Sequence, residues 1–373
     1  MSTDFSEFDV EMTRRALELA AKGVGLVSPN PLVGCVIVSE SGQIVGEGYY
    51  TYEGITHAEV VALNQALEKA RGGVAYVSLE PHGHHGKTPP CTDALINAGI
   101  KRVVSPIEDP NPKVSGEGFE QLRKAGVEVV NGILAEEAFR QNEAFICWHR
   151  NKRPFVHLKL AMSLDGRISL KKSISTALSG ADAVRRVHEI RHEADAILVG
   201  GNTAFVDNPS LTDRSGNPRR RPLVRVILDN RLRLPLDSKL VTTAHEIPTI
   251  IFSNSTDEEK IEALFQRGVQ VPRIDARDLN AVLHELYERE IQGVLVEGGT
   301  EVAGAFCDAN LVDKFTFMVA PIIIGGHDAP TAIGGKGATS ISAASALEKL
   351  QICQHGADFE ITGYPELRQA EAV

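Results

Sequence analysis

Segments typical of helices and of buried strands alternate along the first 150 residues, and this order restricts the fold more than any other feature. Apolar residues recur at helical spacing over 9–23, and residues 33–38 (VGCVIV) are typical of a buried strand. A Ser-Gly pair at 41–42 predicts a turn into a second strand, and therefore a hairpin. Helices over 58–70, from Cys91 and over 117–125 then alternate with strands over 75–79, 102–105 and 127–130. This order predicts a three-layer α/β sandwich.

A polar, basic segment at 149–154 (HRNKRP) interrupts the alternation, and we expect a domain boundary there, with domains 1–148 and 149–373. The length of 373 residues suits two domains of roughly 100–200 residues each. After the boundary we expect strands over 155–161, 196–199, 224–228, 249–252, 293–297 and 315–324, and helices over 181–193, 257–267, 279–290 and from about 301. This pattern predicts a mostly parallel sheet with helices on both faces.

The composition excludes several classes of protein. Hydrophobic residues make up 43% and charged residues 24%, as in ordinary soluble proteins. The net charge of −10 opposes nucleic-acid binding, because that affinity comes largely from protein cations. No apolar run approaches the roughly 20 residues that span a bilayer, and the acidic N-terminus lacks a secretion signal. Five scattered cysteines indicate no disulfide framework, so we expect a cytoplasmic protein whose thiols can bind metal.

A histidine and a glutamate, His57 and Glu59, stand at the start of a predicted helix, and Pro81, His82 and Cys91 follow one strand later. A catalytic zinc ion takes three protein ligands and leaves its fourth position for water. Zinc deaminases carry H-x-E followed by P-C-x-x-C, whereas the second half here reads Pro-His-x₈-Cys. Taken alone, H-x-E favours the plainer interpretation of an ordinary helix start beside a histidine-decorated loop.

Longer strings carry a more specific signal. They are 29–38 (PNPLVGCVIV), 46–49 (GEGY), 79–91 (LEPHGHHGKTPPC), 109–112 (DPNP), 158–166 (LKLAMSLDG), 207–212 (DNPSLT), 226–229 (VILD) and 296–299 (VEGG). In this order, over essentially the whole chain, they resemble the bifunctional deaminase/reductase family of riboflavin biosynthesis. The resemblance implies an α/β chain with an N-terminal cytidine-deaminase-like three-layer sandwich and a C-terminal dihydrofolate-reductase-like domain.

The resemblance implies that the first domain is a zinc hydrolase. The family deaminates 2,5-diamino-6-(5-phosphoribosylamino)pyrimidin-4-one, a phosphorylated pyrimidine. His57 and Cys91 match its zinc ligands, and Glu59 matches the catalytic residue that moves the proton. Asn30 matches the residue that hydrogen-bonds the pyrimidine edge, where an amide offers donor and acceptor together. A polar, basic loop suits the ribose phosphate, the alternative being a solvated loop; its residues are His84, Lys87 and Thr88.

The chain departs from the family pattern at four positions. His82 stands where the family usually has cysteine, Tyr50 and Val61 where it commonly has histidine, and Ala177 where it commonly has tryptophan. Because histidine is an ordinary zinc ligand, we expect zinc to be bound by His57, His82 and Cys91, with His84 or His85 as the alternative to His82.

Two other functions compete with the bifunctional one. The first domain could be a scaffold that only stabilises the reductase, an alternative that the departures at Tyr50, Val61 and His82 keep open. A deaminase of nucleic-acid bases shares the H-x-E pattern, but the net charge of −10 and the attached reductase oppose it. The family's reductase domains commonly pair, so we expect a homodimer or a higher homo-oligomer, with neither nucleic acid nor membrane as a partner.

The second domain lacks the G-x-G-x-x-G pattern, but glycine pairs follow predicted strands at 200–201, 298–299 and 325–326. Thr300, a candidate N-cap, begins a helix whose free N–H groups suit a pyrophosphate. The resemblance implies that this domain reduces the ribosyl group to ribityl with NADPH. The cofactor positions of the family match Ala161, Ala177, Thr203, Asp207, Gly299 and Thr300.

The substrate positions of the reductase match six further residues: Lys159, Ser175, Arg191, Leu211, Arg214 and Glu297. Two arginines and a lysine fit a phosphate-bearing substrate, because the planar guanidinium grips phosphate with two donors. Asp207 and Glu297 are candidate proton donors; the alternative for each is a carboxylate that caps a helix or orients backbone. Hydride transfer itself asks little acid–base chemistry of the protein.

Overall fold

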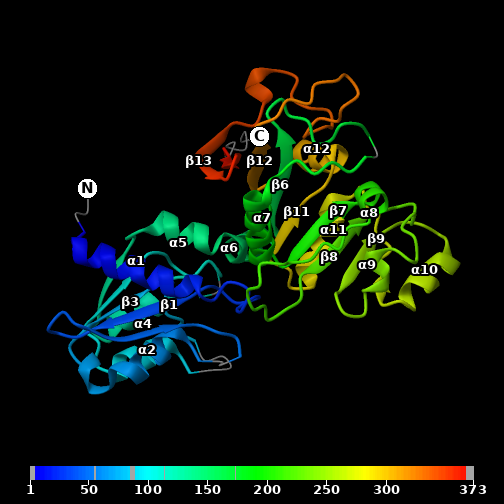
Figure 1. The fold of residues 1–373 in the computed structure, drawn as a ribbon. Helices are drawn as coiled ribbons and strands as arrows, with labels where there is room; N and C mark the ends of the chain where they lie inside the picture. Colours follow the sequence, from blue (N-terminus) through cyan, green and yellow to red (C-terminus); the bar gives the residue numbers. More distant parts are fainter. Residues whose placement is uncertain (1–4, 54–55, 85–88, 113, 173, 367–373) are drawn as a thin grey trace, which may run out of the picture. The chain divides into compact units, whose positions relative to one another are not determined.

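The computed structural model describes residues 5–53, 56–84, 89–112, 114–172 and 174–366 (Figure 1). The chain divides into two compact units. Unit 1 comprises Met1–Lys152 and Pro218–Arg221, and unit 2 comprises Arg153–Asn217 and Pro222–Val373.

Unit 1 contains a five-stranded sheet in the order β2-β1-β3-β4-β5. Its elements are α1 (Glu7–Ala21), β1 (Gly34–Val38), β2 (Ile44–Tyr49), α2 (Ala58–Ala66), η1 (Leu67–Ala70), β3 (Val74–Val77), α3 (Cys91–Asn97), β4 (Arg102–Ser105), α4 (Glu117–Lys124), β5 (Glu128–Asn131), α5 (Ala135–Gln141) and α6 (Glu143–Asn151). Strand β1 is antiparallel to β2 and β3, whereas β3, β4 and β5 are parallel. The predicted hairpin and the predicted order up to β5 are confirmed; α5 and α6 were not predicted.

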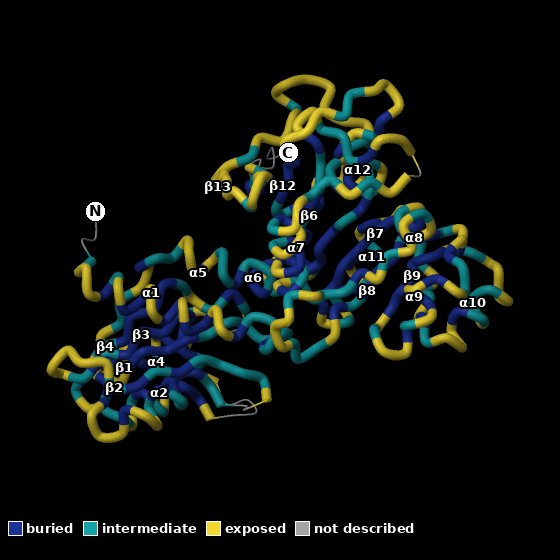
Figure 2. Tube along the Cα trace, viewed as in Figure 1, coloured by how far each residue is buried: buried dark blue, intermediate teal, exposed yellow. Residues whose placement is uncertain are grey.

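Helices cover both faces of this sheet. Alternate strand residues point to opposite sides, and apolar side chains on both sides pack against helices. Ile37 of β1 packs with Ala62 of α2 and Leu95 of α3. Its neighbour Val36 packs in a separate cluster with Met12 of α1. The three central strands, β1, β3 and β4, are accordingly buried, and their tube is mostly dark blue in Figure 2. This arrangement confirms the three-layer sandwich.

Two glycines of β2 bring helix α2 close to the sheet. A Cβ on Gly46 would lie 2.0 Å from the carbonyl oxygen of Ala62, and a Cβ on Gly48 would lie 2.4 Å from that of Ala58. Any larger residue would therefore push the helix away. Close packing thus sets the position of the start of α2, where the 57–59 motif stands.

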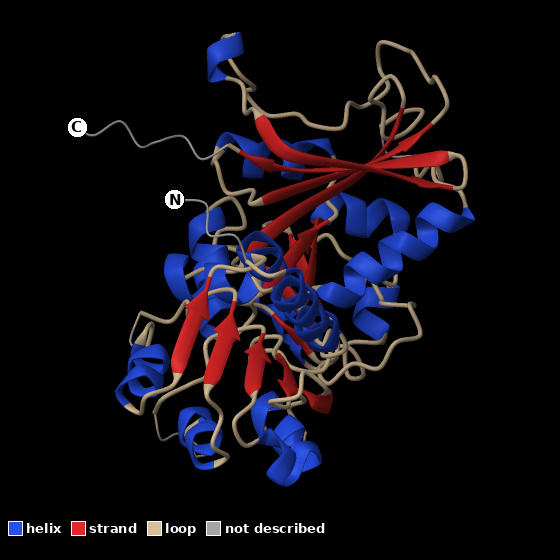
Figure 3. Ribbon diagram, turned by 90° about the vertical axis from the view of Figure 1, so that its left-hand side faces the viewer, coloured by secondary structure: helices blue, strands red, loops and turns tan. Residues whose placement is uncertain are grey.

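Unit 2 contains a nine-stranded sheet in the order β10-β9-β8-β7-β11-β6-β12-β14-β13 (strands red in Figure 3). Its elements are β6 (Phe155–Ser163), α7 (Ala181–Glu193), β7 (Ala196–Gly200), α8 (Gly201–Asp207), β8 (Val224–Leu228), α9 (Lys239–Thr242), β9 (Thr249–Phe252), α10 (Glu258–Phe265), β10 (Val269–Gln270), α11 (Leu279–Glu288), β11 (Gly293–Val296), α12 (Thr300–Asp308), β12 (Lys314–Ala320), η2 (Ile341–Ala343), β13 (Leu347–His355) and β14 (Asp358–Pro365).

The strands from β10 to β12 are parallel, and helices cover both faces. Leu198 of β7 packs with Phe306 of α12 on one face. Ile197, the preceding residue, packs with Leu240 of α9 and Leu264 of α10 on the other. The predicted parallel sheet between two helical layers is confirmed. No helix among the described residues has both the length and the apolar character that crossing a membrane requires.

The C-terminal end of the sheet differs from expectation. The strand predicted over 315–324 ends at Ala320, because the backbone N–H groups of Ile324 and Gly325 donate to the carboxylate of Asp165 instead of to a neighbouring strand. The two strands β13 and β14 pair antiparallel at the sheet edge and were not predicted.

Candidate active sites

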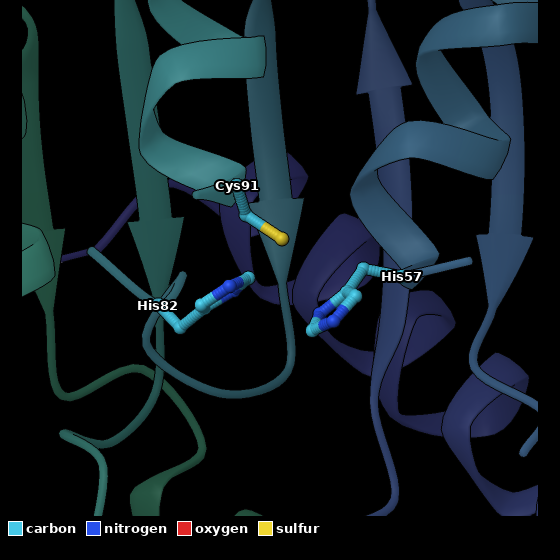
Figure 4. Close-up of side chains that lie close together, drawn as sticks. All are labelled: His57, His82 and Cys91. Carbon is cyan, nitrogen blue, oxygen red and sulfur yellow. The ribbon is translucent and has the colours of Figure 1, made fainter. Parts of the chain in front are cut away.

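Three side chains from separate elements of unit 1 converge on one point. His57 is the N-cap residue of α2, His82 follows β3, and Cys91 is the first residue of α3 (Figure 4). Their ligand atoms all lie within 4.8 Å of one another, and no other such group of three exists among the described residues. Ligand atoms on one zinc ion lie about 3.5 Å apart, so small side-chain shifts bring all three onto one ion.

Backbone hydrogen bonds hold two of these residues at the base of one loop. The carbonyl oxygen of His82 accepts from the backbone N–H groups of Cys91, at 3.1 Å, and Thr92, at 3.4 Å. Gln121 of α4 binds the same loop, since its Nε2 donates to the carbonyl oxygen of Gly83 at 2.7 Å. The backbone hydrogen bonds to the His82 carbonyl oxygen therefore set the distance between His82 and Cys91.

Glu80 anchors the end of the segment that leads to His82, and sequence reasoning missed this role. Its buried carboxylate accepts four backbone N–H groups at 2.9–3.2 Å, from Asp109, Gly116, Gly118 and Phe119. A charged residue directly after a buried strand was the available signal, because a buried carboxylate needs donors. The anchor joins the zinc-ligand loop to the start of α4.

Glu59 lies in the first turn of α2 and is only 2% exposed. Its side chain hydrogen-bonds the thiol of Cys91. Burial raises the pKa of that thiol, and the charge of Glu59 raises it further. Among the residues that the structure describes, none hydrogen-bonds Glu59 Oε2, although the atom is buried. An unpartnered buried carboxylate oxygen is costly, so the site fits a metal ion with a water molecule beside it.

The predicted pyrimidine-binding residue lies near the same cluster. Asn30 donates from Nδ2 to the hydroxyl of Tyr50, and the Tyr50 ring centroid lies 5.7 Å from that of His57. Burial raises the pKa of Tyr50, against the opposite effect of the Asn30 hydrogen bond. Val61, the other departure on this side, packs beside Gly48 of β2. Tyr50 is therefore a member of the site rather than only a departure from a pattern.

The loop residues assigned to the ribose phosphate are only partly described. The His84 ring is exposed and meets the His82 ring edge-on, with centroids 5.3 Å apart. It does not belong to the group of three ligand side chains. Lys87 and Thr88, together with His85, lie outside the described residues.

In unit 2, three charged residues predicted to contact substrate form one buried group. Arg191 of α7 binds Glu297, at the end of β11, through two hydrogen bonds of 2.9 and 2.8 Å. Lys159 of β6 is 8% exposed, and burial lowers its pKa. Although burial raises the pKa of Glu297, the charge of Lys159 and the bonds from Arg191 hold it at about 2. Glu297 is therefore an ionised acceptor at neutral pH.

The other predicted substrate residues of unit 2 differ in how far they are buried. The side chain of Leu211 lies in the hydrophobic core and is 5% exposed. Arg214 and Ser175 are exposed. The Ser175 hydroxyl donates a hydrogen bond to the Asp207 carboxylate. Burial raises the pKa of Asp207, and this hydrogen bond only partly opposes the effect.

Three of the six predicted cofactor residues, Gly299, Thr300 and Thr203, lie at the start of α12. A Cβ on Gly299 would lie 3.6 Å from Thr203 Oγ1 of α8. Gly299 is the N-cap of α12, and this cap residue supplies no side-chain hydrogen bond to the helix. The expectation that Thr300 is the N-cap is wrong: Thr300 is the first helical residue, and its hydroxyl donates to the carbonyl oxygen of Thr331. Ala161 lies on β6, and Ala177 is exposed.

The three glycine pairs differ in the reason for a glycine: in two pairs a helix packs closely, and in the third the backbone has a positive φ. A Cβ on Gly200 or on Gly298 would lie 2.8 or 2.6 Å from the side chain of Val302, so both glycines admit helix α12. Gly325 has a φ of +66°, and a Cβ placed on it would meet no described atom within 4 Å. Close packing of helix α12 therefore accounts for one glycine in each of two pairs, Gly200 and Gly298.

Comparison with known proteins gives the same pairing of domains. Residues 154–361 match the family described as the RibD C-terminal domain, and residues 6–106 match the cytidine and deoxycytidylate deaminase zinc-binding region. Among curated relatives, the riboflavin biosynthesis protein RibD of Actinobacillus pleuropneumoniae is 44% identical over 91% of this chain and 91% of its own. The RibD of Aquifex aeolicus is 42% identical over 95% and 98%.

Two solved structures match over nearly the full length. Acinetobacter baumannii RibD, form 1, has a TM-score of 0.86 at 34% identity, covering 96% of this chain and 99% of that chain. The diaminohydroxyphosphoribosylaminopyrimidine deaminase/5-amino-6-(5-phosphoribosylamino)uracil reductase of Thermotoga maritima has a TM-score of 0.85 at 36% identity, with the same coverage.

Proposed function

The chain belongs to the RibD family of riboflavin biosynthesis proteins, and from this premise we propose that it carries two activities. The N-terminal domain (1–148) deaminates 2,5-diamino-6-(5-phosphoribosylamino)pyrimidin-4-one. The C-terminal domain (149–373) then reduces the ribosyl group of the product to a ribityl chain with NADPH. The observation that carries the proposal is the convergence of His57, His82 and Cys91 beside the unpartnered oxygen of Glu59. It favours a working deaminase over a domain that only stabilises the reductase.

In the deaminase, His57, His82 and Cys91 would hold zinc. Zinc bound there would lower the pKa of a water molecule toward neutrality. Glu59 would take the first proton of the attacking water at Oε2 and give it to a pyrimidine ring nitrogen as the C–O bond forms. It would then carry the second proton, from the new hydroxyl group, to the amine, which leaves as ammonia when the C–N bond breaks. Its buried position suits this role, because a carboxylate shielded from bulk water keeps the proton within the site.

Substrate binding in the deaminase rests on hydrogen bonds from the polypeptide. Asn30 donates one Nδ2–H to the hydroxyl of Tyr50. The second N–H and the Oδ1 of Asn30 then bind the pyrimidine edge. The loop residues His84, Lys87 and Thr88 bind the ribose phosphate.

In the reductase, substrate binds Lys159, Ser175, Arg191, Leu211, Arg214 and Glu297. NADPH supplies the hydride, and Ala161, Ala177, Thr203, Asp207, Gly299 and Thr300 line its site. The uncapped N-terminus of α12 supports this placement, because its free N–H groups bind phosphate oxygens. We also propose that the protein is cytoplasmic and forms a homodimer or a higher homo-oligomer.

The test is stepwise turnover by the purified full chain supplied with zinc. We expect about one zinc per chain, ammonia release from the diaminopyrimidinone without NADPH, and NADPH oxidation only with the deaminated product. Glu59→Gln should slow ammonia release by about 10²–10⁴-fold while it retains zinc and reductase activity. The exposed Glu68→Gln is the matched control. A chain that binds no zinc and releases no ammonia would contradict the bifunctional proposal.

A further inference from the structure

Three consecutive residues of unit 2, Thr212, Asp213 and Arg214, are held by polar side chains of helix α7. Arg191 Nη1 donates to the carbonyl oxygen of Thr212 at 3.1 Å. Nδ1 of His192 and Oδ2 of Asp213 lie 2.8 Å apart. Nδ1 of His188 accepts from the backbone N–H of Arg214 at 3.2 Å. These donors and acceptors share one face of α7, because residues three and four apart in a helix are neighbours.

The 212–214 segment needs such support. It has no helix or strand of its own and is preceded by Leu211, which has a φ of +48°. A branched residue in this left-handed region persists only where contacts on both sides hold it. On one side the Leu211 side chain is locked in the core. On the other side the α7 contacts complete the restraint.

We propose that His188 and His192 are positioning residues for the reductase step. They fix the 212–214 segment on α7, so that Arg214 is held in place to present its charge to the substrate phosphate. This inference rests on the proposed function, which supplies the phosphate-bearing substrate. Neither histidine is a catalytic residue, because each acts through the segment that it holds.

The two histidines respond to protonation in opposite ways. His188 accepts at Nδ1, so it must be neutral with its proton on Nε2, and protonation removes the acceptor. His192 faces the Asp213 carboxylate, so its cation still donates and the contact strengthens. Low pH therefore releases the Arg214 end of the segment and leaves the Asp213 contact intact.

Burial and the surrounding charges together favour the neutral form of His188. Burial lowers its pKa, and the charges of Arg191 on the same helix and of Arg214 lower it further. Asp213 on the held segment and Glu297 at the end of β11 oppose them without reversing the shift. The acid limb of substrate binding should thus fall below pH 6.5, the ordinary range of histidine.

The experiment compares His188→Leu with His188→Asn in the full-length protein, because the Oδ1 of asparagine takes the place of Nδ1 as acceptor. We expect His188→Leu to raise the KM for the reductase substrate by about tenfold, with a smaller change in kcat and unchanged NADPH affinity. His188→Asn should restore the KM and abolish its rise at low pH. Val184→Ala, an exposed change on the same helix, is the control.

The outcomes separate this inference from the proposed function. No NADPH oxidation by the wild type would overturn the proposed function. An active wild type with an unaltered KM in His188→Leu, or with an equal loss of NADPH affinity, would overturn only the positioning role. If His188→Leu does not fold, the pH profile of His188→Asn decides: an acid limb identical to that of the wild type contradicts the inference.

Discussion

Asn30 donates a hydrogen bond of 2.6 Å from Nδ2 to the hydroxyl oxygen of Tyr50, and this bond links the predicted pyrimidine-binding residue to a residue beside His57. The amide of Asn30 has two N–H donors and one carbonyl acceptor. With one donor engaged, the amide plane is fixed and the remaining pair can face a pyrimidine edge. A tyrosine at position 50 is thus compatible with a working deaminase site.

Tyr50→Phe removes this hydrogen bond and keeps the ring. A neutral hydrogen bond contributes about 0.5–1.5 kcal/mol, so we expect the KM for deamination to rise by about three- to tenfold. The reductase kinetics should not change, because Tyr50 belongs to unit 1. Ammonia release at varied substrate concentration checks this, with Tyr49→Phe as the neighbouring control. An unchanged KM would remove Tyr50 from the substrate site.

The zinc ligands are tested by stoichiometry. His82→Ala should lose most of its zinc, because only two of the three converging ligands remain. His84→Ala should keep full zinc, since its exposed ring lies outside that group. Metal analysis of the two purified variants after dialysis gives the answer. Full zinc in His82→Ala together with loss in His84→Ala would reverse the assignment.

Replacing Arg214 and replacing Arg191 by alanine should have different effects on the stability of the protein. Arg214→Ala should raise the KM for the reductase substrate more than it weakens NADPH binding, and the Tm should not change, because this side chain is exposed. Arg191→Ala should raise the KM and also lower the Tm, since Glu297 loses its two-bond partner in a buried setting. Kinetics with each ligand and thermal melts distinguish the two. Equal losses of substrate and NADPH affinity would show that the roles are misassigned.

The stability of unit 1 should depend on pH through Asp9. Hydrogen bonds from Arg102 hold the pKa of this buried carboxyl at about 2, against 3.8 for an unperturbed aspartate. A lowered folded-state pKa stabilises the fold by about 2 kcal/mol above the unfolded pKa. That contribution is lost as the pH falls from about 4 to about 2.

Asp9→Asn should remove this pH dependence. Unfolding of the full chain can be followed by the fluorescence of its one tryptophan, Trp148, which lies in α6 of unit 1. Glu128→Gln is the control, because Glu128 also contacts Arg102 but is 65% exposed. An exposed ion pair contributes little, so this variant should follow the wild type. An equal pH response in Asp9→Asn and wild type would contradict the account.

Much of the fold was predictable because the relevant signals are local. The alternation of Val36 and Ile37 between two faces follows from the period of a strand, and α7 was predicted with the bounds that it has. The β13–β14 hairpin escaped prediction because its outer strand is an exposed edge without a buried, regularly alternating face. The apolar residues after Ala320 suggested a longer strand, but the N–H of Ile322 donates back to Ala320, and those of Ile324 and Gly325 donate to Asp165.

By itself, the sequence determined the order of the elements, the family strings and the residue types available for zinc and phosphate. Only the tertiary structure decided which of them meet. His57, His82 and Cys91 lie in separate parts of unit 1, and the hydrogen bond from the Cys91 N–H to the His82 carbonyl oxygen sets the distance between the latter two. The role of Tyr50, the anchoring carboxylate of Glu80 and the α7 contacts to Arg214 likewise depend on residues far apart in the chain. Helical and strand periods are properties of neighbouring residues, whereas hydrogen-bond partners are selected by packing between distant segments.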